Sequence, residues 1–442
     1  MRTFLLSMAI LLLVPACTPA TPSSEQAAVE TVVAATLSAA DNIPVATPDE
    51  PTPRETASEA HAAEPVLVVA YTVERNLWVV TTDTAPRQLT ADGAITEIVL
   101  SEDADRIAYV RSNDETGETS LHVYDLDVDA SRLLLDQSVL DTLYPTDPGA
   151  RLTLDLRNLQ FLPGSHNLLL STQYVYQGPG ARQNNDLYRI NTDSGELSSL
   201  LGIDAGGRVS LSPDASSMAL TTPDSLRFVS MEGAPLGDVR LRFDNVLTYS
   251  EYAYVPQAVW SPDGAGVYTV IPSPDPFAPD ASARVMRVTL EDSPPETMQL
   301  ISGSLFILDA FGAPWIDPTT SHIAYLQTAG EGSRRALTLA PLAGGATTFI
   351  TEGSLEWEGW SPDGTQFAYT TLGADSALLI AAPGRSPELI PGGRSLRWVD
   401  GVAVVLTGTP GDWTLLLYTP MGEIRSLATS NGEFVAYDVA MR

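Results

Sequence analysis

The chain has 442 residues, of which 44% are hydrophobic and 18% are charged, so it contains enough apolar material for a large folded core. Its 55 acidic residues outnumber 24 basic ones, all of them Arg, and the formal net charge is −31. A surface this negative, without a basic stripe, excludes nucleic acid as a partner. A single Cys excludes disulfide frameworks, CxxC redox chemistry and zinc sites with two thiolates within one chain.

Residues 1–16 predict a secretion signal, because Arg2 precedes an apolar run that is too short to span a bilayer. The end of this run, Val14-Pro15-Ala16-Cys17, resembles the lipobox of bacterial lipoproteins. The resemblance implies cleavage before Cys17 and lipid modification of that residue. We therefore expect a secreted protein that is anchored to a membrane by lipid and faces the periplasm or the extracellular side. The alternative is an ordinary signal peptide in which Cys17 has no role.

The segment after the anchor residue is built mainly from Ala, Thr, Pro, Glu and Ser, and positions 18–65 contain no Phe, Trp or Tyr. Such a composition buries too little apolar surface to offset the entropy of ordering, which predicts a disordered linker. The chain is thus expected to comprise a signal peptide over 1–16, an anchor and linker over 17–65, and a folded part over 66–442.

From residue 66 onward one unit recurs, in which an apolar strand, a tight turn and further apolar strands follow one another. The turn is clearest as Leu-Ser-Pro-Asp at 211–214 and as Trp-Ser-Pro-Asp-Gly at 260–264 and 360–364. Pro sets φ for the first central position, Asp bonds its own backbone, and Gly accepts a positive φ. Four strands per unit around such turns predict the blades of an all-β propeller.

Weaker copies of the turn occur at 100–103, 161–164, 315–318 and 398–401. Residues 66–90 offer only three strands, and the surplus apolar strand over 434–439 would complete that blade. The count predicts eight four-stranded blades, with seven as the alternative because the unit at 398–401 is degenerate. A closed ring protects its sheet edges, so we expect a monomer. The first strands end in side chains expected between blades: Trp260, Trp315, Trp360 and Trp398.

The turns and the Ala-Tyr pairs at 108–109, 324–325 and 368–369 resemble the WD40-like PD40 repeats of TolB-type β-propellers. These repeats are related to the propellers of prolyl-oligopeptidase-type peptidases. The resemblance covers residues 66–442 and implies a fold, because the motif lies in turns rather than in a site. The resemblance also implies the hypothesis that the propeller serves as an assembly module for an envelope complex.

Four long insertions, at 136–157, 172–186, 244–256 and 271–283, are expected on the face opposite the short turns. A rigid ring with elaborated loops on one face presents that face to a ligand. The insertions carry Tyr, Arg and Phe, types that can anchor an envelope protein, peptide or glycan, although they could also simply cap the propeller. The candidate ligand-binding residues are Tyr144, Arg151, Tyr174, Tyr176, Arg182, Tyr249, Tyr252, Tyr254 and Phe277.

No catalytic, metal-binding or cofactor-binding residue is predicted. The chain has no GxSxG nucleophile motif, and no hydrolase domain follows the propeller. The His spacings give no zinc pair, and Asp125, Asp127 and Asp129 lack the Gly and Glu of a calcium loop. The first hypothesis is a non-enzymatic binding scaffold. The alternative is a glycan lyase or hydrolase, which would need two or three carboxylates with a His or Arg at the mouth of the central channel.

Overall fold

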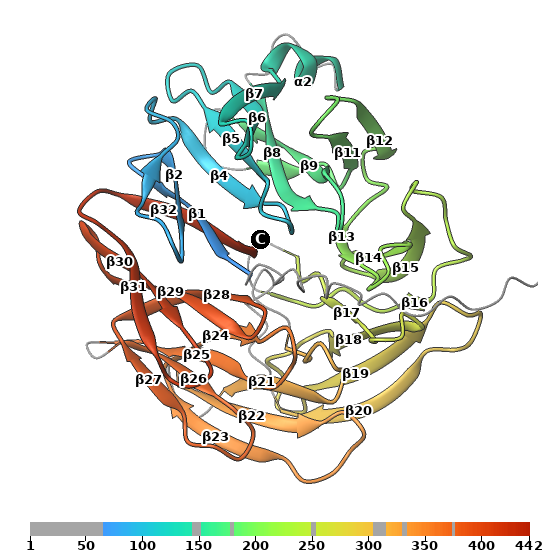
Figure 1. Ribbon diagram of the computed structural model, residues 1–442. Helices are drawn as coiled ribbons and strands as arrows, with labels where there is room; N and C mark the ends of the chain where they lie inside the picture. The colour runs from blue at the N-terminus through green and yellow to red at the C-terminus, as the bar shows by residue number, and fades with distance from the viewer. Residues whose placement is uncertain are drawn as a thin grey trace, which may run out of the picture. The chain divides into compact units, whose positions relative to one another are not determined.

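The computed structural model describes residues 65–143, 152–176, 181–248, 253–303, 315–328, 334–373 and 376–442. These residues lie in one compact unit, 64–442, that contains eight antiparallel sheets arranged as the blades of a β-propeller (Figure 1). The predicted fold class is therefore confirmed, with eight blades, and the alternative of seven is wrong. The predicted signal peptide, Cys17 and the linker lie outside the described residues. Within the described part, no helix has both the length and the apolar character needed to cross a membrane.

Blades A to D are taken in chain order. Blade A consists of β1 (Leu67–Val73), β2 (Asn76–Thr81), β3 (Arg87–Gln88) and β32 (Phe434–Met441). Blade B consists of β4 (Ile95–Leu100), β5 (Arg106–Ser112), β6 (Thr119–Asp125) and β7 (Ala130–Leu135), and the helix α2 (Gln137–Leu143) follows it. Blade C consists of β8 (Leu152–Phe161), β9 (Asn167–Tyr176), β10 (Ala181–Gln183), β11 (Leu187–Asn191) and β12 (Leu197–Leu201). Blade D consists of β13 (Arg208–Leu211), β14 (Ser217–Thr221), β15 (Ser225–Ser230) and β16 (Leu241–Arg242).

Blades E to H complete the ring. Blade E consists of β17 (Ala258–Trp260), β18 (Gly266–Pro272), β19 (Ser282–Thr289) and β20 (Glu296–Ser302). Blade F consists of β21 (His322–Thr328), β22 (Arg335–Pro341) and β23 (Thr348–Gly353), with an isolated bridge between Ile316 and Ile323 at its inner position. Blade G consists of β24 (Leu355–Trp360), β25 (Phe367–Thr371), β26 (Ala377–Ala381) and β27 (Glu388–Pro391). Blade H consists of β28 (Gly393–Val399), β29 (Val402–Thr409), β30 (Asp412–Tyr418) and β31 (Ile424–Ser430).

The two ends of the described chain close the ring, as predicted from the surplus strand. The C-terminal strand β32 forms the inner edge of blade A and pairs with β1, in a register that runs from Leu67 opposite Met441 to Val73 opposite Phe434. Beyond the last pair, the backbones of Val66 and Arg442 exchange two hydrogen bonds of 2.9 Å each. Figure 1 shows the C-terminus in the middle of the ring, beside the first strand.

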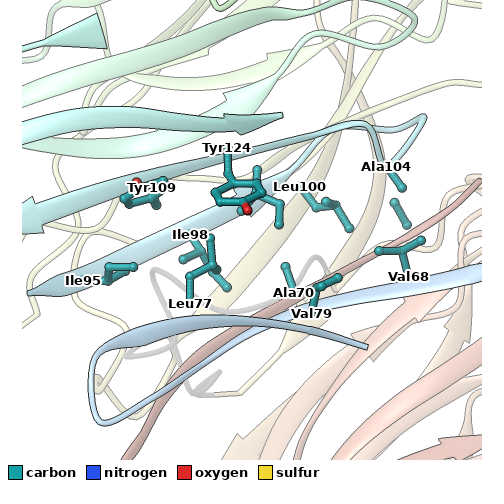
Figure 2. Close-up of a cluster of buried hydrophobic side chains, with 12 residues drawn as sticks. Val68, Ala70, Leu77, Val79, Ile95, Ile98, Leu100, Ala104, Tyr109 and Tyr124 are labelled. Atoms are coloured by element: carbon teal, nitrogen blue, oxygen red, sulfur yellow. The ribbon is translucent and has the colours of Figure 1, made fainter. Parts of the chain in front are cut away.

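The core lies between the blades rather than within a separate layer. Among the described residues there are eight clusters of buried hydrophobic side chains, and each joins two neighbouring blades. Figure 2 shows the cluster between blades A and B, with Val68 and Leu77 on one side and Ile98 and Tyr109 on the other. Since both faces of each sheet are covered, the second strands read as apolar runs without polar alternation.

The Ser-Pro-Asp turns close as their residue types predict. Ser261 and Ser361 donate to the carboxylates of Asp263 and Asp363, each of which also accepts a 3.0 Å bond from the backbone two residues on. Gly264 takes a φ of 68° where the next strand begins. These turns join first to second strands and lie with the turns between third and fourth strands on one face, which we call the short-turn face. The opposite face, with the remaining connections, is the long-loop face.

Candidate functional site

All four long insertions connect a second to a third strand, or a fourth strand to the next blade, so the described parts lie on the long-loop face as predicted. Some of the aromatic residues there are structural. Tyr254 is 8% exposed, and its hydroxyl donates to the carbonyl of Val270 at 2.9 Å. Tyr174 is half-buried against the cluster between blades B and C, whereas Phe277 is 46% exposed.

The remaining sequence candidates cannot be placed as side chains. Tyr144, Arg151, Tyr249 and Tyr252 lie outside the described residues. The backbones of Tyr176 and Arg182 are described, in β9 and β10, but their side chains are not. Their ligand-binding role, like that of Phe277, stays a prediction.

A pocket of about 450 Å³ opens on the long-loop face between blades C and D. The inner strand β8 contributes its bulged segment from Arg157 to Gln160, and β13 contributes the segment from Gly207 to Val209. The loop between β9 and β11 contributes Gln183 and Asn185, and the loop after β14 contributes Thr222. The side chains that meet here come from two blades and from the connection leading to a third.

A buried polar network holds the wall of this pocket on the blade C side. The carboxylate of Asp186, 1% exposed, accepts from the backbone N–H of Thr172 at 2.7 Å and from its hydroxyl at 2.5 Å. The amide nitrogen of the fully buried Asn184 donates to the same hydroxyl oxygen at 2.7 Å. Charge-assisted hydrogen bonds in a dry environment are the strong ones, so the loop that carries Gln183 and Asn185 is anchored to β9.

The charge of the pocket differs from that of the whole molecule. Its lining contains Arg157 and Arg208 and no Asp or Glu, although acidic residues outnumber basic ones by 55 to 24 in the chain. Arg157 is oriented by Asp155, whose Oδ2 lies 2.7 Å from Nη2. With its amide oxygen turned toward Arg157, Gln173 also accepts from Nη2 at 2.8 Å and from Nε at 2.6 Å. Asp155 therefore balances the charge of Arg157 at the edge of the pocket.

A second hollow, of about 560 Å³, lies on the short-turn face and draws its lining from the inner strands and turns of blades D to H. Its walls are Trp, Pro and aliphatic side chains, with one carboxylate, Glu358, and one guanidinium-bearing residue, Arg397. Trp260 and Trp360 are fixed by hydrogen bonds from Nε1 to the carbonyls of Ser210 (3.0 Å) and Trp315 (2.9 Å). Trp260 and Trp360 are 6% and 7% exposed, which agrees with their predicted place between blades, whereas Trp315 and Trp398 are half-buried.

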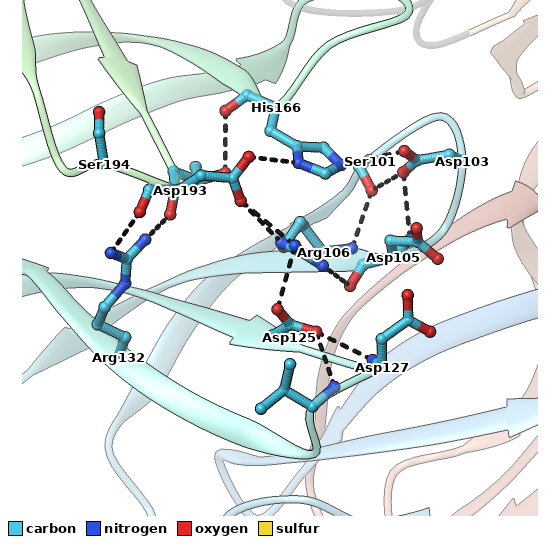
Figure 3. A network of polar contacts seen from close by, with 12 residues as sticks. Ser101, Asp103, Asp105, Arg106, Asp125, Asp127, Arg132, His166, Asp193 and Ser194 are labelled. Carbon is cyan, nitrogen blue, oxygen red and sulfur yellow. Dashed lines mark hydrogen bonds and ion pairs between the residues drawn. The ribbon is translucent and has the colours of Figure 1, made fainter.

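A network of charged side chains ties blades A, B and C together on the short-turn face, and Figure 3 shows the part of it in blades B and C. His166 lies between two carboxylates, with Nδ1 at 2.8 Å from Asp193 and Nε2 at 3.0 Å from Asp103. Arg106 lies 3.3 Å from Asp193 and 3.1 Å from the carboxylate of Asp125. The C-terminal Arg442 pairs with Asp105 and Asp127.

The hydrogen bonds and ion pairs of this network link neighbouring blades. Burial alone would lower the pKa of His166, but the hydrogen bonds and charges of Asp193 and Asp103 outweigh burial and raise this pKa above 6.5. Since both ring nitrogens can donate only in the imidazolium form, the two carboxylates favour the protonated ring. Asp103, Asp105 and His166 could together offer three ligand atoms to a metal ion, within 4.8 Å of one another. A cation there would displace His166 and Arg442 from their present partners.

The His166 network predicts a defined pH dependence of stability. Because the folded pKa of His166 is raised, its contribution is complete below about pH 6.5 and is lost as the pH rises through the folded pKa. Burial raises the pKa values of Asp103 and Asp193, but hydrogen bonds from the ring and from neighbouring groups lower them overall, so their contribution is lost only in acid. We expect His166→Gln to lower the free energy of unfolding at pH 5.5 and to lower it less at pH 8.5. Urea unfolding at both pH values measures this, and a larger effect at pH 8.5 would contradict it.

This network was not predicted from the sequence, where the His spacings were considered only for a zinc pair. A signal was present in the repeat itself: Asp103 and His166 occupy the equivalent turns of consecutive units, and such turns lie side by side in a propeller. Asp125 ends β6, and Asp127 and Asp129 lie in the turn that follows it. There Asp125 accepts from the backbone N–H groups of Asp127 and Val128, and Asp129 pairs with Arg87.

No family model and no curated protein matches the chain. Solved structures similar to it include TolB from Acinetobacter baumannii, with 14% identity, 85% of this chain covered and a TM-score of 0.36; the match spans 66% of TolB. The eukaryotic initiation factor matches with 12% identity, 85% and 98% of the two chains covered, and a TM-score of 0.50. Oligogalacturonate lyase in complex with manganese matches with 15% identity, 75% and 85% covered, and a TM-score of 0.45. These likenesses concern the fold, which is consistent with the predicted TolB-like propeller.

Proposed function

We propose that the protein is a non-enzymatic binding scaffold, anchored to the membrane through Cys17, that holds an extracytoplasmic ligand on its long-loop face. The observation that carries this proposal is the pocket between blades C and D, with its two Arg residues and its wall anchored by Asp186. Pockets of about 300–1,000 Å³ with a few fixed polar groups are typical ligand sites.

The path of the chain supports the choice of face. Strand β1 begins beside Met441, at the end of β32 that reaches the short-turn face. The polypeptide that leads to Cys17 therefore joins the propeller on the short-turn face.

The same geometry gives less support to an enzyme that uses channel carboxylates. The hollow at the centre of the short-turn face has Glu358 and Arg397 among Trp and Pro side chains, and the long-loop pocket has no carboxylate in its lining. Groups that combine His with Asp occur at two places in the described chain. His166 already has both ring nitrogens in hydrogen bonds. Nδ1 of His322 lies 3.4 Å from Asp317, whose carboxylate already accepts from the backbone N–H groups of Ser321 and His322. General acid–base catalysis needs a group free to exchange a proton with substrate.

Site-specific photo-crosslinking in intact cells tests which face is used. A photoreactive residue would replace Phe277 or Thr222 on the long-loop face, and Val128 or Met421 on the short-turn face of the full chain. Val128 and Met421 are matched controls for Phe277, because all three are exposed hydrophobic side chains. Their exposed fractions are 71%, 84% and 46%, respectively. We expect the same crosslinked species from both long-loop positions and not from the short-turn positions. Crosslinks confined to the short-turn positions would contradict the proposal.

A further inference from the structure

We propose that a hollow of about 230 Å³ between blades D and E binds a free aliphatic α-amino acid, with Arg284 at its carboxylate and Asp244 at its ammonium group. The hollow lies on the long-loop face, where β16, β18 and β20 end, and we call it the rim notch. The inference goes beyond the proposed scaffold function, because the ligand is a small molecule and the rim notch is separate from the pocket between blades C and D.

The rim notch exists because the outer strand of blade D is short. Strand β16 has two residues, whereas β20, the outer strand of blade E, has seven. Ile271, Arg284 and Leu300 pair in register across β18, β19 and β20, so their side chains share the face of blade E that looks toward blade D. Ile271 is buried in the cluster between the two blades, but Leu300, at the outer edge, is 61% exposed. The register therefore directs Arg284 and Leu300 into the rim notch.

The two charged groups of the rim notch are unpaired. Within the part of the chain that the structure describes, the guanidinium group of Arg284 and the carboxylate of Asp244 make no hydrogen bond or ion pair, with each other or with another group. Arg287, on the same strand, instead pairs with Glu296 at 4.0 Å. An unpaired cation and an unpaired anion that line one small hollow complement a ligand that carries both charges, as an α-amino acid does.

The other walls of the rim notch suit a short aliphatic side chain. Pro272 and Leu300 provide apolar surface. The backbone N–H of Leu247 donates to the carbonyl of Pro274 at 2.7 Å, which holds the segment with Asp244 against the loop between β18 and β19. Walls that are already in place need little ordering on binding. A volume of about 230 Å³ is below the range of about 300–1,000 Å³ typical of drug-sized ligands, so the ligand is small.

The test uses the full chain, L-leucine and three analogues of leucine. Leucinamide lacks the carboxylate, N-acetyl-leucine lacks the ammonium group, and N-acetyl-leucinamide lacks both. Saturation-transfer NMR titrations compare the affinities in about 0.15 M salt, which screens the net charge of −31. We expect leucine to bind, and each singly blocked analogue to bind about tenfold more weakly. The doubly blocked analogue is expected not to bind measurably.

Two substitutions assign each charge of the ligand to one residue. Arg284→Gln is expected to weaken leucine binding about tenfold and to leave leucinamide binding unchanged, because leucinamide has no carboxylate for this residue to bind. Asp244→Asn is expected to weaken leucine binding about tenfold and to leave N-acetyl-leucine binding unchanged. Both side chains are exposed, so the variants are expected to fold, and thermal unfolding checks this. If one variant does not fold, the analogues on the native protein still decide.

Arg287→Gln and Asp280→Asn are the matched controls. Arg287 lies on the same strand as Arg284, and Asp280 is exposed in the loop between β18 and β19, but neither lines the rim notch. The two control substitutions change the net charge by the same amounts as the two test substitutions. They are expected to leave leucine binding unchanged.

Three results would overturn the inference: no binding of leucine, equal binding of leucine and the singly blocked analogues, or equal losses in the test and control variants. Binding of N-acetyl-leucinamide as tight as that of leucine would overturn it in favour of an aliphatic protein segment. These results leave the scaffold function standing, because the long-loop crosslinks test that function separately. If leucine binds as expected but the long-loop crosslinks fail, the amino-acid site stands and the scaffold function is wrong.

Discussion

Removal of residues 434–442 is expected to abolish the cooperative unfolding of the propeller. This segment contains β32, so its loss strips the inner strand from blade A and leaves β1 as an open edge. It also removes Tyr437 from the cluster between blades A and H, and it removes the Asp438 carboxylate that accepts from the backbone N–H of Leu100 at 2.8 Å. Urea unfolding followed by circular dichroism of the full chain and the truncated chain measures the effect.

A point substitution separates ring closure from the ion pairs at the terminus. Arg442→Ala removes the contacts with Asp105 and Asp127 but keeps β32 and the backbone hydrogen bonds with Val66, and such exposed pairs are worth about 1 kcal/mol or less. We expect this variant to unfold in a single transition close to that of the full chain. If the chain without residues 434–442 had the urea-unfolding midpoint and slope of the full chain, the stability of the ring would not depend on β32.

Asp186→Ala is expected to lower the free energy of unfolding by about 3 kcal/mol. The substitution leaves the buried N–H and hydroxyl of Thr172 without the carboxylate acceptor, which is itself 1% exposed. The anchor of the loop that carries Gln183 and Asn185 is lost at the same time, so binding in the pocket should weaken as well. The measurement is urea unfolding with the slope compared between variants.

Two substitutions serve as controls for the Asp186 prediction. Asp186→Asn keeps one acceptor oxygen in place and should lose about half as much stability. Asp224→Ala removes an exposed carboxylate from the corresponding loop of blade D, where it accepts from the hydroxyl of Thr222, and should change stability by less than about 0.5 kcal/mol. Equal effects of Asp186→Ala and Asp224→Ala would show that burial of the network contributes nothing.

The fold was largely predictable because its determinants are local and repeated. The turn residues, such as Pro262 and Gly264, act within a few positions of themselves, and the same pattern recurs often enough for the blades to be counted. Even the long-range contact of β1 with β32 followed from counting, because a unit with three strands and a surplus strand elsewhere leave one way to complete the blade. Among the described residues blade F departs from the pattern, because a single bridge between Ile316 and Ile323 lies at the position of a first strand.

The candidate site was predictable only in part. The long-loop face followed from the connection order of the strands, whereas the residues expected to bind a ligand were chosen by type. Tyr254 shows the weakness of that choice, since its ring is buried and its hydroxyl bonds a backbone carbonyl. Arg157 and Arg208 were not among the predicted binding residues, because nothing in their local sequence distinguishes them from other Arg residues in strands.

By itself the sequence determined the all-β propeller, its eight blades, the closing strand and the division into two unlike faces, because these depend on strand patterns and turn residues that repeat along the chain. Only the tertiary structure decided which side chains from different blades meet. Arg157 and Arg208 are 51 positions apart, and His166 and Asp103 are 63 positions apart, yet each pair lines one pocket or forms one hydrogen bond. Such contacts depend on how neighbouring sheets pack and twist against each other. That geometry is a property of the assembled ring rather than of any single blade.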